Sequence, residues 1–390
     1  MPNSKAKSFR LLYIISFLSF LFMLGLGIAL PSLPLAVLSA GGTSFEASLV
    51  ISVWGITYVF LNIPLGMITD IIGPKKTVPL ATLGNGLIAL LYFFTRTYTF
   101  FILGRFLQGI LEAMVWNGLF GLIAYIYENQ KLKALGFLSG AMSLGFSIGP
   151  AFNSVISTFL DFKVTFIPYF LTSFISGIGF LLLMNKIQYY KIIKTDVKSL
   201  TKLAFRRTDI LFVLALIIIV CFGFLDSILQ SHYSLIINFW NVSSGTGSWL
   251  LSIYYLSVLI SQISLKYTHS IAESKIFTPL SLFIAFILLG SHSLLRNSLY
   301  LLVLTWSYVG VTVGINSVKI QTMLADRLKT RSSTAMGIFY TSWGIGYVLG
   351  GPLSIYMLEY LLLLDFISIL FLINTIISFI LTIFFVKIRR

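Results

Sequence analysis

Four polar residues in otherwise apolar sequence have the types needed for proton or charge chemistry. Arg105, Gln108 and Glu112 stand at i, i+3 and i+7 in one apolar segment, so a helix would place them on one face. Asp226 lies alone in a second apolar segment. A charge at the centre of a bilayer costs about 2.5–3.5 kcal/mol on insertion scales. If these segments cross a membrane, the polar faces must look into the protein or into a watery cavity.

The two acids are expected to have different roles. Removal from water penalises the ionised form of an isolated carboxyl group, so Asp226 is the better candidate for taking up and releasing a proton. Arg105 favours the ionised form of Glu112, which makes Glu112 a candidate counter-charge for a substrate. Two structural alternatives stay open. Gln108 could bridge an Arg105–Glu112 ion pair, and hydroxyl groups could satisfy Asp226.

A second set of candidates consists of residues that share a helical face with these groups or form aromatic stripes. They are Trp116, Gln230, Tyr233, Tyr254, Tyr340, Trp343 and Tyr347. If such faces line a cavity, they suit flat or cationic organic ligands through stacking and cation–π contacts. Aromatic residues make up 15% of the chain. Core packing and interfacial belts therefore remain the alternative for each single aromatic residue.

The elements that must position these groups are predicted to be membrane-spanning helices. The chain has 390 residues, of which 57% are apolar and 10% charged. A soluble domain usually has about 25% charged residues, and so few charges could not cover the surfaces of soluble domains. The aromatic content and the long apolar runs exclude a disordered chain. We expect an all-α integral membrane protein.

The chain is predicted to cross the membrane twelve times. A helix that crosses the ~30 Å hydrocarbon layer needs about 20 mainly apolar residues. The segments that qualify are 11–34, 46–68, 78–95, 99–125, 134–158, 164–184, 210–238, 248–266, 276–294, 298–320, 333–357 and 362–386. The first run is too long for the core of a signal peptide. A basic linker, 185–209, divides the chain into six-helix bundles within 1–184 and 210–390.

The basic residues set the predicted orientation. The chain has 27 Lys and Arg against 12 Asp and Glu, and most of the basic residues lie in connections on the side of the N-terminus. The positive-inside rule therefore places both termini and the basic linker in the cytoplasm. The net charge of +15 is then a topology signal and gives no reason to expect nucleic-acid binding. The plasma membrane is the expected location.

The two halves of the chain resemble each other at a fixed offset. Glycines in the fourth and fifth spans recur 201 residues further on in the tenth and eleventh. The pairs are Gly109 and Gly310, Gly136 and Gly337, Gly145 and Gly346, and Gly149 and Gly350. Six spans separate the copies, so both halves cross the membrane in the same direction. Parallel repeats of this kind place a substrate site near the midplane between two bundles.

A basic turn with two glycines follows the second span. Its marked residues are Gly66, Asp70, Gly73, Lys75 and Lys76. This pattern resembles the signature loop of the major facilitator superfamily, and it lies between the spans where that family has it. Gly66 permits close helix approach and Gly73 a tight turn, while the resemblance implies that Asp70 stabilises one state of a gate. Ile71 stands where the family usually has a basic residue. An ordinary basic turn that retains topology is the alternative.

Two further motifs fit the same resemblance. Arg105, Gln108 and Gly109 are similar to the family's Arg-x-x-Gln-Gly motif in the fourth span. The fifth span resembles the glycine motif of the proton-coupled antiporters, especially drug exporters. Its residues are Gly136, Gly145, Gly149 and Pro150, and Asn153 and Ser154 follow where the family has two more glycines. Helix packing alone is the alternative for this glycine pattern.

The resemblance covers essentially the whole chain and implies a secondary transporter. Two pseudo-symmetric six-helix bundles would alternate between inward-open and outward-open states around a central cavity. The implied function is proton-coupled efflux of a lipophilic or cationic small molecule. The alternative in the same fold is a proton-driven uptake symporter for a nutrient or metabolite. More distant alternatives are a membrane sensor that does not transport, or an enzyme acting on lipid-linked substrates, for which the sequence offers no catalytic cluster.

No cofactor or metal is expected. The chain has no nucleotide-binding fingerprint, so an ion gradient, most simply of protons, is the expected energy source. The lone Cys221 and three scattered histidines provide no metal-ligand spacing. The expected partners are a small-molecule substrate and the bilayer, with no nucleic acid. One chain would already contain a complete cavity, so we expect it to function as a monomer.

Overall fold

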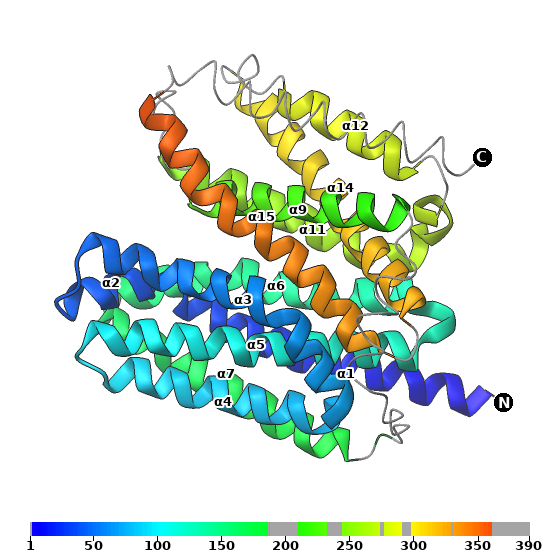
Figure 1. The fold of residues 1–390 in the computed structure, drawn as a ribbon, viewed down its shortest axis with the longest axis horizontal. Helices are drawn as coiled ribbons and strands as arrows, with labels where there is room; N and C mark the ends of the chain where they lie inside the picture. Colours follow the sequence, from blue (N-terminus) through cyan, green and yellow to red (C-terminus); the bar gives the residue numbers. More distant parts are fainter. Residues whose placement is uncertain are drawn as a thin grey trace. The chain divides into compact units, whose positions relative to one another are not determined.

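The computed structural model describes residues 2–185, 187, 210–231, 244–273, 277–290, 298–328 and 331–360, and all the regular structure in these ranges is helical. Figure 1 shows the helices in chain order. The first half contains α1 (Pro2–Ala29), α2 (Ser32–Ser39), α3 (Ser44–Ile72), α4 (Pro74–Phe94), α5 (Tyr98–Ile126), α6 (Lys131–Phe159) and α7 (Phe166–Met184). Two 3-10 turns, η1 (Glu128–Gln130) and η2 (Phe162–Thr165), precede α6 and α7.

The second half contains five described helices. They are α9 (Ile210–Ser231), α11 (Ser244–Glu273), α12 (Phe277–Gly290), α14 (Leu299–Arg327) and α15 (Ser332–Tyr360). Each of the first eleven predicted spans therefore coincides with helix over most of its length. The twelfth, 362–386, lies outside the described residues. The cytoplasmic position of the termini stays a prediction.

One predicted span is divided. The segment 11–34 was expected to be a single helix, but α1 ends at Ala29 and α2 begins at Ser32. Pro31 lies between them, and proline lacks the N–H that would continue the hydrogen-bond ladder and disfavours helical geometry in the residue before it. The chain therefore breaks there.

The turn between α3 and α4 has the predicted geometry. Gly73 has φ +95°, in the left-handed region that glycine adopts without strain, and its N–H closes α3 on the carbonyl of Thr69. Pro74 begins α4 at a position where its missing N–H costs no hydrogen bond. At the other end of α3, Thr43 and Glu46 form a reciprocal capping box.

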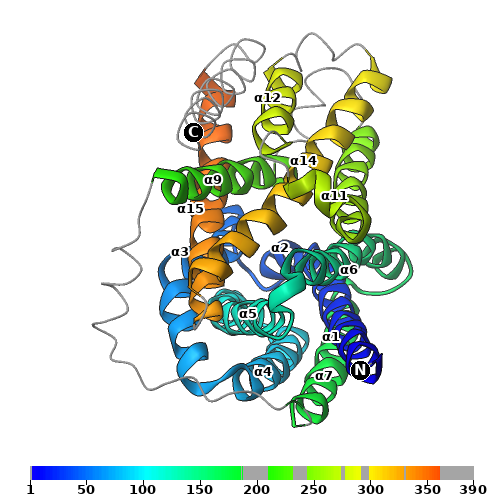
Figure 2. The same ribbon diagram turned by 90° about the vertical axis from the view of Figure 1, so that its right-hand side faces the viewer.

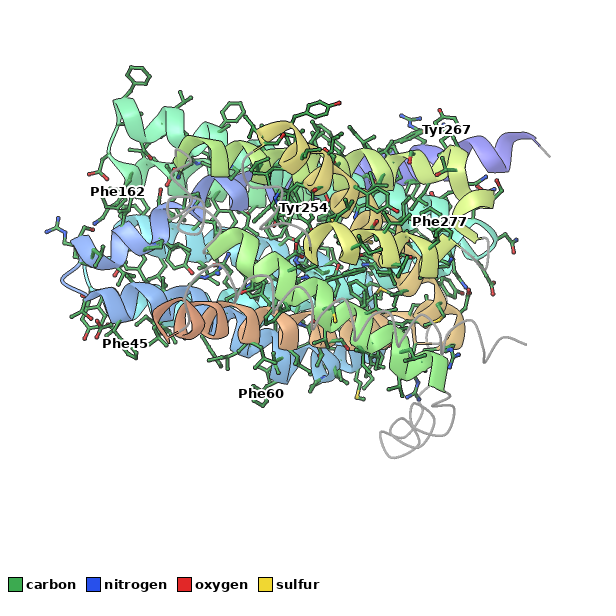
Figure 3. All side chains as sticks on the ribbon, turned by 90° about the horizontal axis from the view of Figure 1, so that it is seen from above. Phe45, Phe60, Phe162, Tyr254, Tyr267 and Phe277 are labelled. Carbon is green, nitrogen blue, oxygen red and sulfur yellow. The ribbon has the colours of Figure 1, made fainter. Side chains whose placement is uncertain are left out.

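Seven helical segments in the described part of the chain are long and apolar enough to cross a bilayer. They are Arg10–Ala29, Ser52–Ile72, Pro74–Phe94, Tyr98–Ile126, Glu128–Ser157, Phe162–Met184 and Leu299–Arg327. A shorter apolar stretch is Phe212–Ser227. Large apolar side chains also face outward, among them Phe45 and Phe60, which Figure 3 shows at the edge of the molecule. This is the surface of a multi-pass membrane protein, in which lipid covers exposed apolar side chains.

The chain forms two compact units. The first comprises Met1–Lys194 with Gln321–Thr341, and the second comprises Thr195–Ile320 with Ser342–Arg390. In the first unit α1 packs against α6 and α7, α4 against α5 and α7, and α3 against α5. Figure 2 shows α4, α5 and α7 as neighbours in this unit. The first ten residues of α15 belong to the first unit and the rest of the helix to the second.

The internal repeat reappears in how each unit packs. A Cβ on Gly145 of α6 would lie 2.5 Å from the Phe20 carbonyl oxygen of α1. A Cβ on Gly346 of α15 would overlap the Val220 carbonyl oxygen of α9. Both glycines thus permit a helix backbone to approach where a side chain would clash. Phe20 and Val220 are themselves 200 residues apart, so equivalent glycines face equivalent points on equivalent helices.

A second pair of helices repeats in the same way. Gly109 of α5 faces the side chain of Thr57 in α3, and Gly310 of α14 faces Ser257 in α11. Thr57 and Ser257 again lie 200 residues apart. The offset found in the sequence is therefore an offset in structure, and it relates α3 to α11 as well as α5 to α14.

Candidate functional site

The face predicted on α5 forms a buried polar network in the first unit. Arg105, Gln108 and Glu112 are all almost fully buried. Gln108 lies between the two charges: its Oε1 accepts from Arg105 Nη1 at 3.1 Å, and its Nε2 donates to Glu112 Oε1 at 2.8 Å. Arg105 also donates through Nε to the Val50 carbonyl oxygen at 3.1 Å. Gln108 thus bridges the charges, as one of the sequence-based alternatives anticipated.

Trp54 of α3 completes the surroundings of Glu112. Its indole Nε1 donates to Glu112 Oε2 at 3.0 Å, and the guanidinium carbon of Arg105 lies 5.5 Å from the centre of its ring. Trp54 Nε1 and Gln108 Nε2 are both donors, so the hydrogen bonds described for Glu112 match an ionised carboxylate. Trp54 was not identified from the sequence.

Three more residues that the sequence analysis did not identify extend the hydrogen-bond network of Gln108. Tyr92 donates to its Oε1 at 3.0 Å, and its Nε2 donates to the Tyr169 hydroxyl at 2.9 Å. Tyr169 in turn donates to Asn85 Oδ1 at 3.0 Å. The Gln108 amide therefore makes four hydrogen bonds, which is its full capacity. The only sequence signal was the presence of Asn85 in an otherwise apolar span.

The carboxylate of Asp226 in α9 is held from two other helices of the second unit. Trp343 Nε1 of α15 donates to Oδ2 at 2.9 Å, and the Tyr254 hydroxyl of α11 donates to Oδ1 at 2.9 Å. The side chain of Tyr254, labelled in Figure 3, is fully buried. The Trp343 ring stacks on Tyr347, with ring centres 4.8 Å apart. A hydroxyl group thus satisfies Asp226, as the alternative anticipated.

The remaining cavity candidates have different surroundings. Trp116 is buried, with its ring centre 5.3 Å from that of Phe22. Tyr340 lies edge-on to Phe120 and Tyr58 in the first unit. The Gln230 side chain and the whole of Tyr233 lie outside the described residues. Whether any of these side chains contacts a substrate stays a prediction.

Asp70 in the predicted gating loop caps the start of α15. Oδ1 accepts from the Ser333 N–H at 3.1 Å, and Oδ2 accepts from the Thr334 N–H at 2.8 Å and the Thr334 hydroxyl at 2.5 Å. A negative charge at a helix N-terminus is favoured by the macrodipole and by the unpaired N–H groups there. Gly66 allows this approach, since a Cβ there would lie 2.7 Å from the Ser333 carbonyl oxygen. We call this contact of Asp70 with Ser333 and Thr334 the α15 latch.

One cation near the latch, Arg331, stands at a position that the sequence did not single out. Arg331 immediately precedes α15. Partial burial lowers the pKa of Arg331, and Asp70 opposes that shift. Lys75 of the predicted loop instead donates to the Ile187 carbonyl oxygen, and Lys76 is exposed.

An ion pair joins two helix ends in the first unit. Lys131 at the start of α6 pairs with Asp326 near the end of α14. The Lys131 side chain is buried and the Asp326 side chain is half exposed, so the ion pair lies at the surface of the first unit. The sequence could not reveal this pair, since its members are far apart in the chain.

The glycine motif of α6 packs closely on α1. Gly149 contacts Gly27, Gly145 contacts Phe20, and Gly136 is buried. Pro150 is exposed within the helix. Asn153, which stands in place of a family glycine, donates to the Ile28 carbonyl oxygen at 2.6 Å and to Ser32 Oγ at 2.7 Å. Asn153 therefore links α6 to the break between α1 and α2 by side-chain hydrogen bonds, which a glycine could not form.

Known proteins match the chain over its length. Residues 15–239 and 215–390 match the family model described as Major Facilitator Superfamily. An uncharacterised MFS-type transporter of Methanocaldococcus jannaschii is 27% identical over 359 residues, covering 87% of this chain and 88% of the relative. The quinolone resistance protein NorA of Staphylococcus aureus is 24% identical over 147 residues, which is 37% of this chain and 38% of NorA.

Solved structures share the fold. The fucose:proton symporter FucP of E. coli gives a TM-score of 0.75 at 16% identity, covering 96% of this chain and 98% of FucP. The human organic anion transporter MFSD10 (TETRAN) gives 0.73 at 15% identity, covering 96% of this chain and 99% of that protein. At this identity the similarity concerns the fold alone. Together with the family match, it confirms the resemblance found in the sequence: the chain belongs to the Major Facilitator Superfamily and is a multi-pass membrane transporter, not an enzyme.

Proposed function

We propose that this transporter exports a lipophilic or cationic small molecule across the plasma membrane in exchange for protons. The observation that carries the proposal is the contrast between its two carboxylates. The hydrogen bonds described for Glu112 come from two groups that only donate, whereas Asp226 is held by one partner that only donates and one that both donates and accepts. One acid is thus suited to staying charged, and the other to gaining and losing a proton.

Asp226 is the proposed proton carrier. It lies in α9 between two helices of the second unit, held by Tyr254 and Trp343. A carboxyl group that meets alternate sides of the membrane in alternate states can take a proton from one side and release it on the other. This role requires no cofactor and no ATP, in keeping with a secondary transporter.

Glu112 is the proposed counter-charge for the substrate. Its carboxylate is buried with Arg105 and Gln108 and accepts from the half-buried Trp54, which stacks on Tyr58 with ring centres 4.1 Å apart. Such an aromatic pair beside a carboxylate suits a flat or cationic molecule through stacking and cation–π contact. Arg105 keeps the local charge balanced when no cation is bound.

The α15 latch is the proposed gate contact. Asp70 holds the start of α15 through charge-assisted hydrogen bonds, which are stronger than neutral ones. Release of these bonds would free α15 to change its packing. The latch would then stabilise one of the two alternating states.

Two observations favour export as the direction of transport. The α6 glycine pattern is similar to that of proton-coupled antiporters, and the partial match to NorA is to a protein named for quinolone resistance. The alternative is proton-driven uptake, the type of transport for which FucP is named. We favour efflux and expect a single chain to carry it out.

A flux assay in proteoliposomes tests the proposal. A pH dye reports lumenal pH while a fluorescent lipophilic cation, such as ethidium, reports substrate movement. Antiport predicts that the substrate and protons cross in opposite directions, whereas movement in the same direction would establish symport. Asp226→Asn should abolish substrate movement driven by a pH gradient. Asp161→Asn, at an exposed site beside η2, is the matched control and should leave it unchanged.

A further inference from the structure

The repeat places an aromatic donor at the same position beside the carboxylate of each unit. Trp54 of α3 donates to Glu112 at 3.0 Å, and Tyr254 of α11 donates to Asp226 at 2.9 Å. Positions 54 and 254 differ by the offset of 200 that also relates the glycine contacts of α3 and α11. The two carboxylates lie on different helices, so this aromatic position is what the two sites have in common.

The surroundings of the aromatic position repeat as well. Arg105 of α5 lies over the Trp54 ring at 5.5 Å. Trp306 of α14, 201 residues after Arg105, lies edge-on to the Tyr254 ring with centres 6.2 Å apart. The second unit thus has an indole where the first has a guanidinium. Tyr254 and Trp54 therefore occupy equivalent positions in the fold as well as in the sequence.

The two aromatic residues differ in one chemical respect. An indole N–H only donates a hydrogen bond, whereas a phenol hydroxyl donates and accepts. Trp54 can therefore stabilise a charged Glu112 but offers nothing to the O–H of a protonated one. Tyr254 can donate to Asp226 when the carboxyl is ionised and accept from it when the carboxyl is protonated. Trp343, also an indole, can serve Asp226 only as a donor to Oδ2.

We propose that Tyr254 is the positioning residue that allows Asp226 to be loaded with a proton, with Trp343 as the fixed donor that keeps the carboxyl in place. On loading, the proton binds Oδ1, the Tyr254 hydroxyl rotates about its C–O bond, and the new O–H donates to the Tyr254 oxygen. Tyr254 keeps its own proton throughout, so the only net change is one proton on Asp226. The inference rests on the proposed role of Asp226 as proton carrier.

The other titratable groups described around Asp226 do not complicate the assignment of the proton to its carboxyl group. From α11, Tyr255 lies edge-on to Tyr254 at 5.0 Å, and from α15 Tyr347 stacks on Trp343. Trp306 of α14 does not titrate. Among the described residues that face this site, the titratable groups besides Asp226 are thus tyrosines, whose ordinary pKa near 10 lies above the working range of the assay.

The test compares Tyr254→Phe with Trp343→Phe in the purified full-length protein, using pH-difference infrared spectroscopy to follow the carbonyl band of a protonated carboxyl. Asp226→Asn identifies the band that belongs to Asp226. Loss of Trp343 removes a donor that favours the ionised form, so the midpoint should move by about one pH unit toward alkaline pH. Loss of the Tyr254 hydroxyl removes a partner from both forms, so the midpoint should move much less.

The transport readout completes the test. In Tyr254→Phe the maximal rate of flux driven by a pH gradient should fall about tenfold, because the protonated carboxyl lacks an acceptor, while the half-saturating substrate concentration stays the same. Tyr254→Trp, which copies position 54, supplies a donor but no acceptor, so the midpoint of the Asp226 band should move by about one pH unit toward acidic pH. Equal midpoint shifts in the two Phe variants would show that Tyr254 is merely a second fixed donor and would overturn the inference.

The two proposals fail in different ways. If Asp226→Asn retains flux driven by a pH gradient, Asp226 is not the proton carrier and the proposed function is wrong on this point. If Asp226→Asn abolishes that flux and the infrared band, but the two Phe variants behave alike, only the role of Tyr254 is wrong.

Discussion

The α15 latch gives the sharpest prediction for a single side chain. Asp70→Asn keeps the size of the residue but removes its charge and replaces one acceptor oxygen with an amide N–H₂ group. Asp70 now accepts three hydrogen bonds, from the N–H groups of Ser333 and Thr334 and from the Thr334 hydroxyl. The substitution should therefore weaken two of these bonds and lose the third.

The magnitude follows from the geometry. Hydrogen bonds to a charged group contribute about 1.5–3 kcal/mol each and neutral ones about 1 kcal/mol. The charge also interacts with the α15 N-terminus, which is worth up to about 2 kcal/mol in a partly buried setting. Since the released groups regain some bonds to water, we expect a net loss of about 2 kcal/mol for the latched state. This corresponds to a roughly 30-fold change in the equilibrium between the latched and released states.

Cysteine labelling can measure this change. Ser332→Cys, at a buried position at the start of α15, would be placed in a Cys221→Ser background and its rate of reaction with a maleimide followed. If labelling requires release of the latch, the rate should rise about 30-fold in Asp70→Asn. Thr334→Val removes only the hydroxyl bond and should give a smaller rise than Asp70→Asn.

Asp161→Asn controls for the loss of a negative charge elsewhere and should leave the labelling rate unchanged. An Asp70→Asn rate within twofold of the parent would refute the assignment of Asp70 as the group that holds α15. An equal rise in Asp161→Asn would show that net charge, and not the latch, sets the labelling rate.

Three other substitutions test separate parts of the account. Glu112→Gln should raise the half-saturating concentration of a cationic substrate at least tenfold in flux assays and leave that of a neutral one nearly unchanged, and equal effects on both would argue against a counter-charge. Gly346→Ala places a methyl group against the α9 backbone and should lower stability by about 1–3 kcal/mol, seen as a lower Tm in detergent. Gly84→Ala is its control, since the clash there is only with the movable side chain of Leu111, and it should cost less. Asn153→Ala removes two hydrogen bonds to the α1–α2 break and should cost about 1–2 kcal/mol, and an unchanged Tm would show that the bonds contribute nothing.

The sequence alone predicted the elements well because apolar length and turn chemistry are local properties. The left-handed turn at Gly73 is an example, since glycine before proline at the end of an apolar run specifies it. The shared face of Arg105, Gln108 and Glu112 is another, because helical spacing fixes it. The division of the first span at Pro31 was missed, although the proline itself is the cause.

The partners of the charged groups could not be predicted in the same way. Which side chain meets Asp226 depends on how α9, α11 and α15 are rotated about their axes, and spacing within one helix does not contain that information. Tyr254 and Trp343 were named as cavity candidates, which stays a prediction, and their hydrogen bonds to Asp226 were not foreseen. Trp54 gave no signal until the offset between α3 and α11 was seen in the packing. The repeat is thus the one sequence feature that could have linked Trp54 with Tyr254.

The central claim is that Asp226 couples proton movement to substrate movement, and Asp226→Asn tests it most directly in one proteoliposome preparation. Exchange of labelled for unlabelled substrate requires no net proton transfer, whereas accumulation driven by a pH gradient does. We predict that Asp226→Asn retains exchange at near the parental rate and loses more than nine-tenths of the accumulation driven by a pH gradient. Accumulation that still responds to the pH gradient in Asp226→Asn, at the parental extent, would contradict the account.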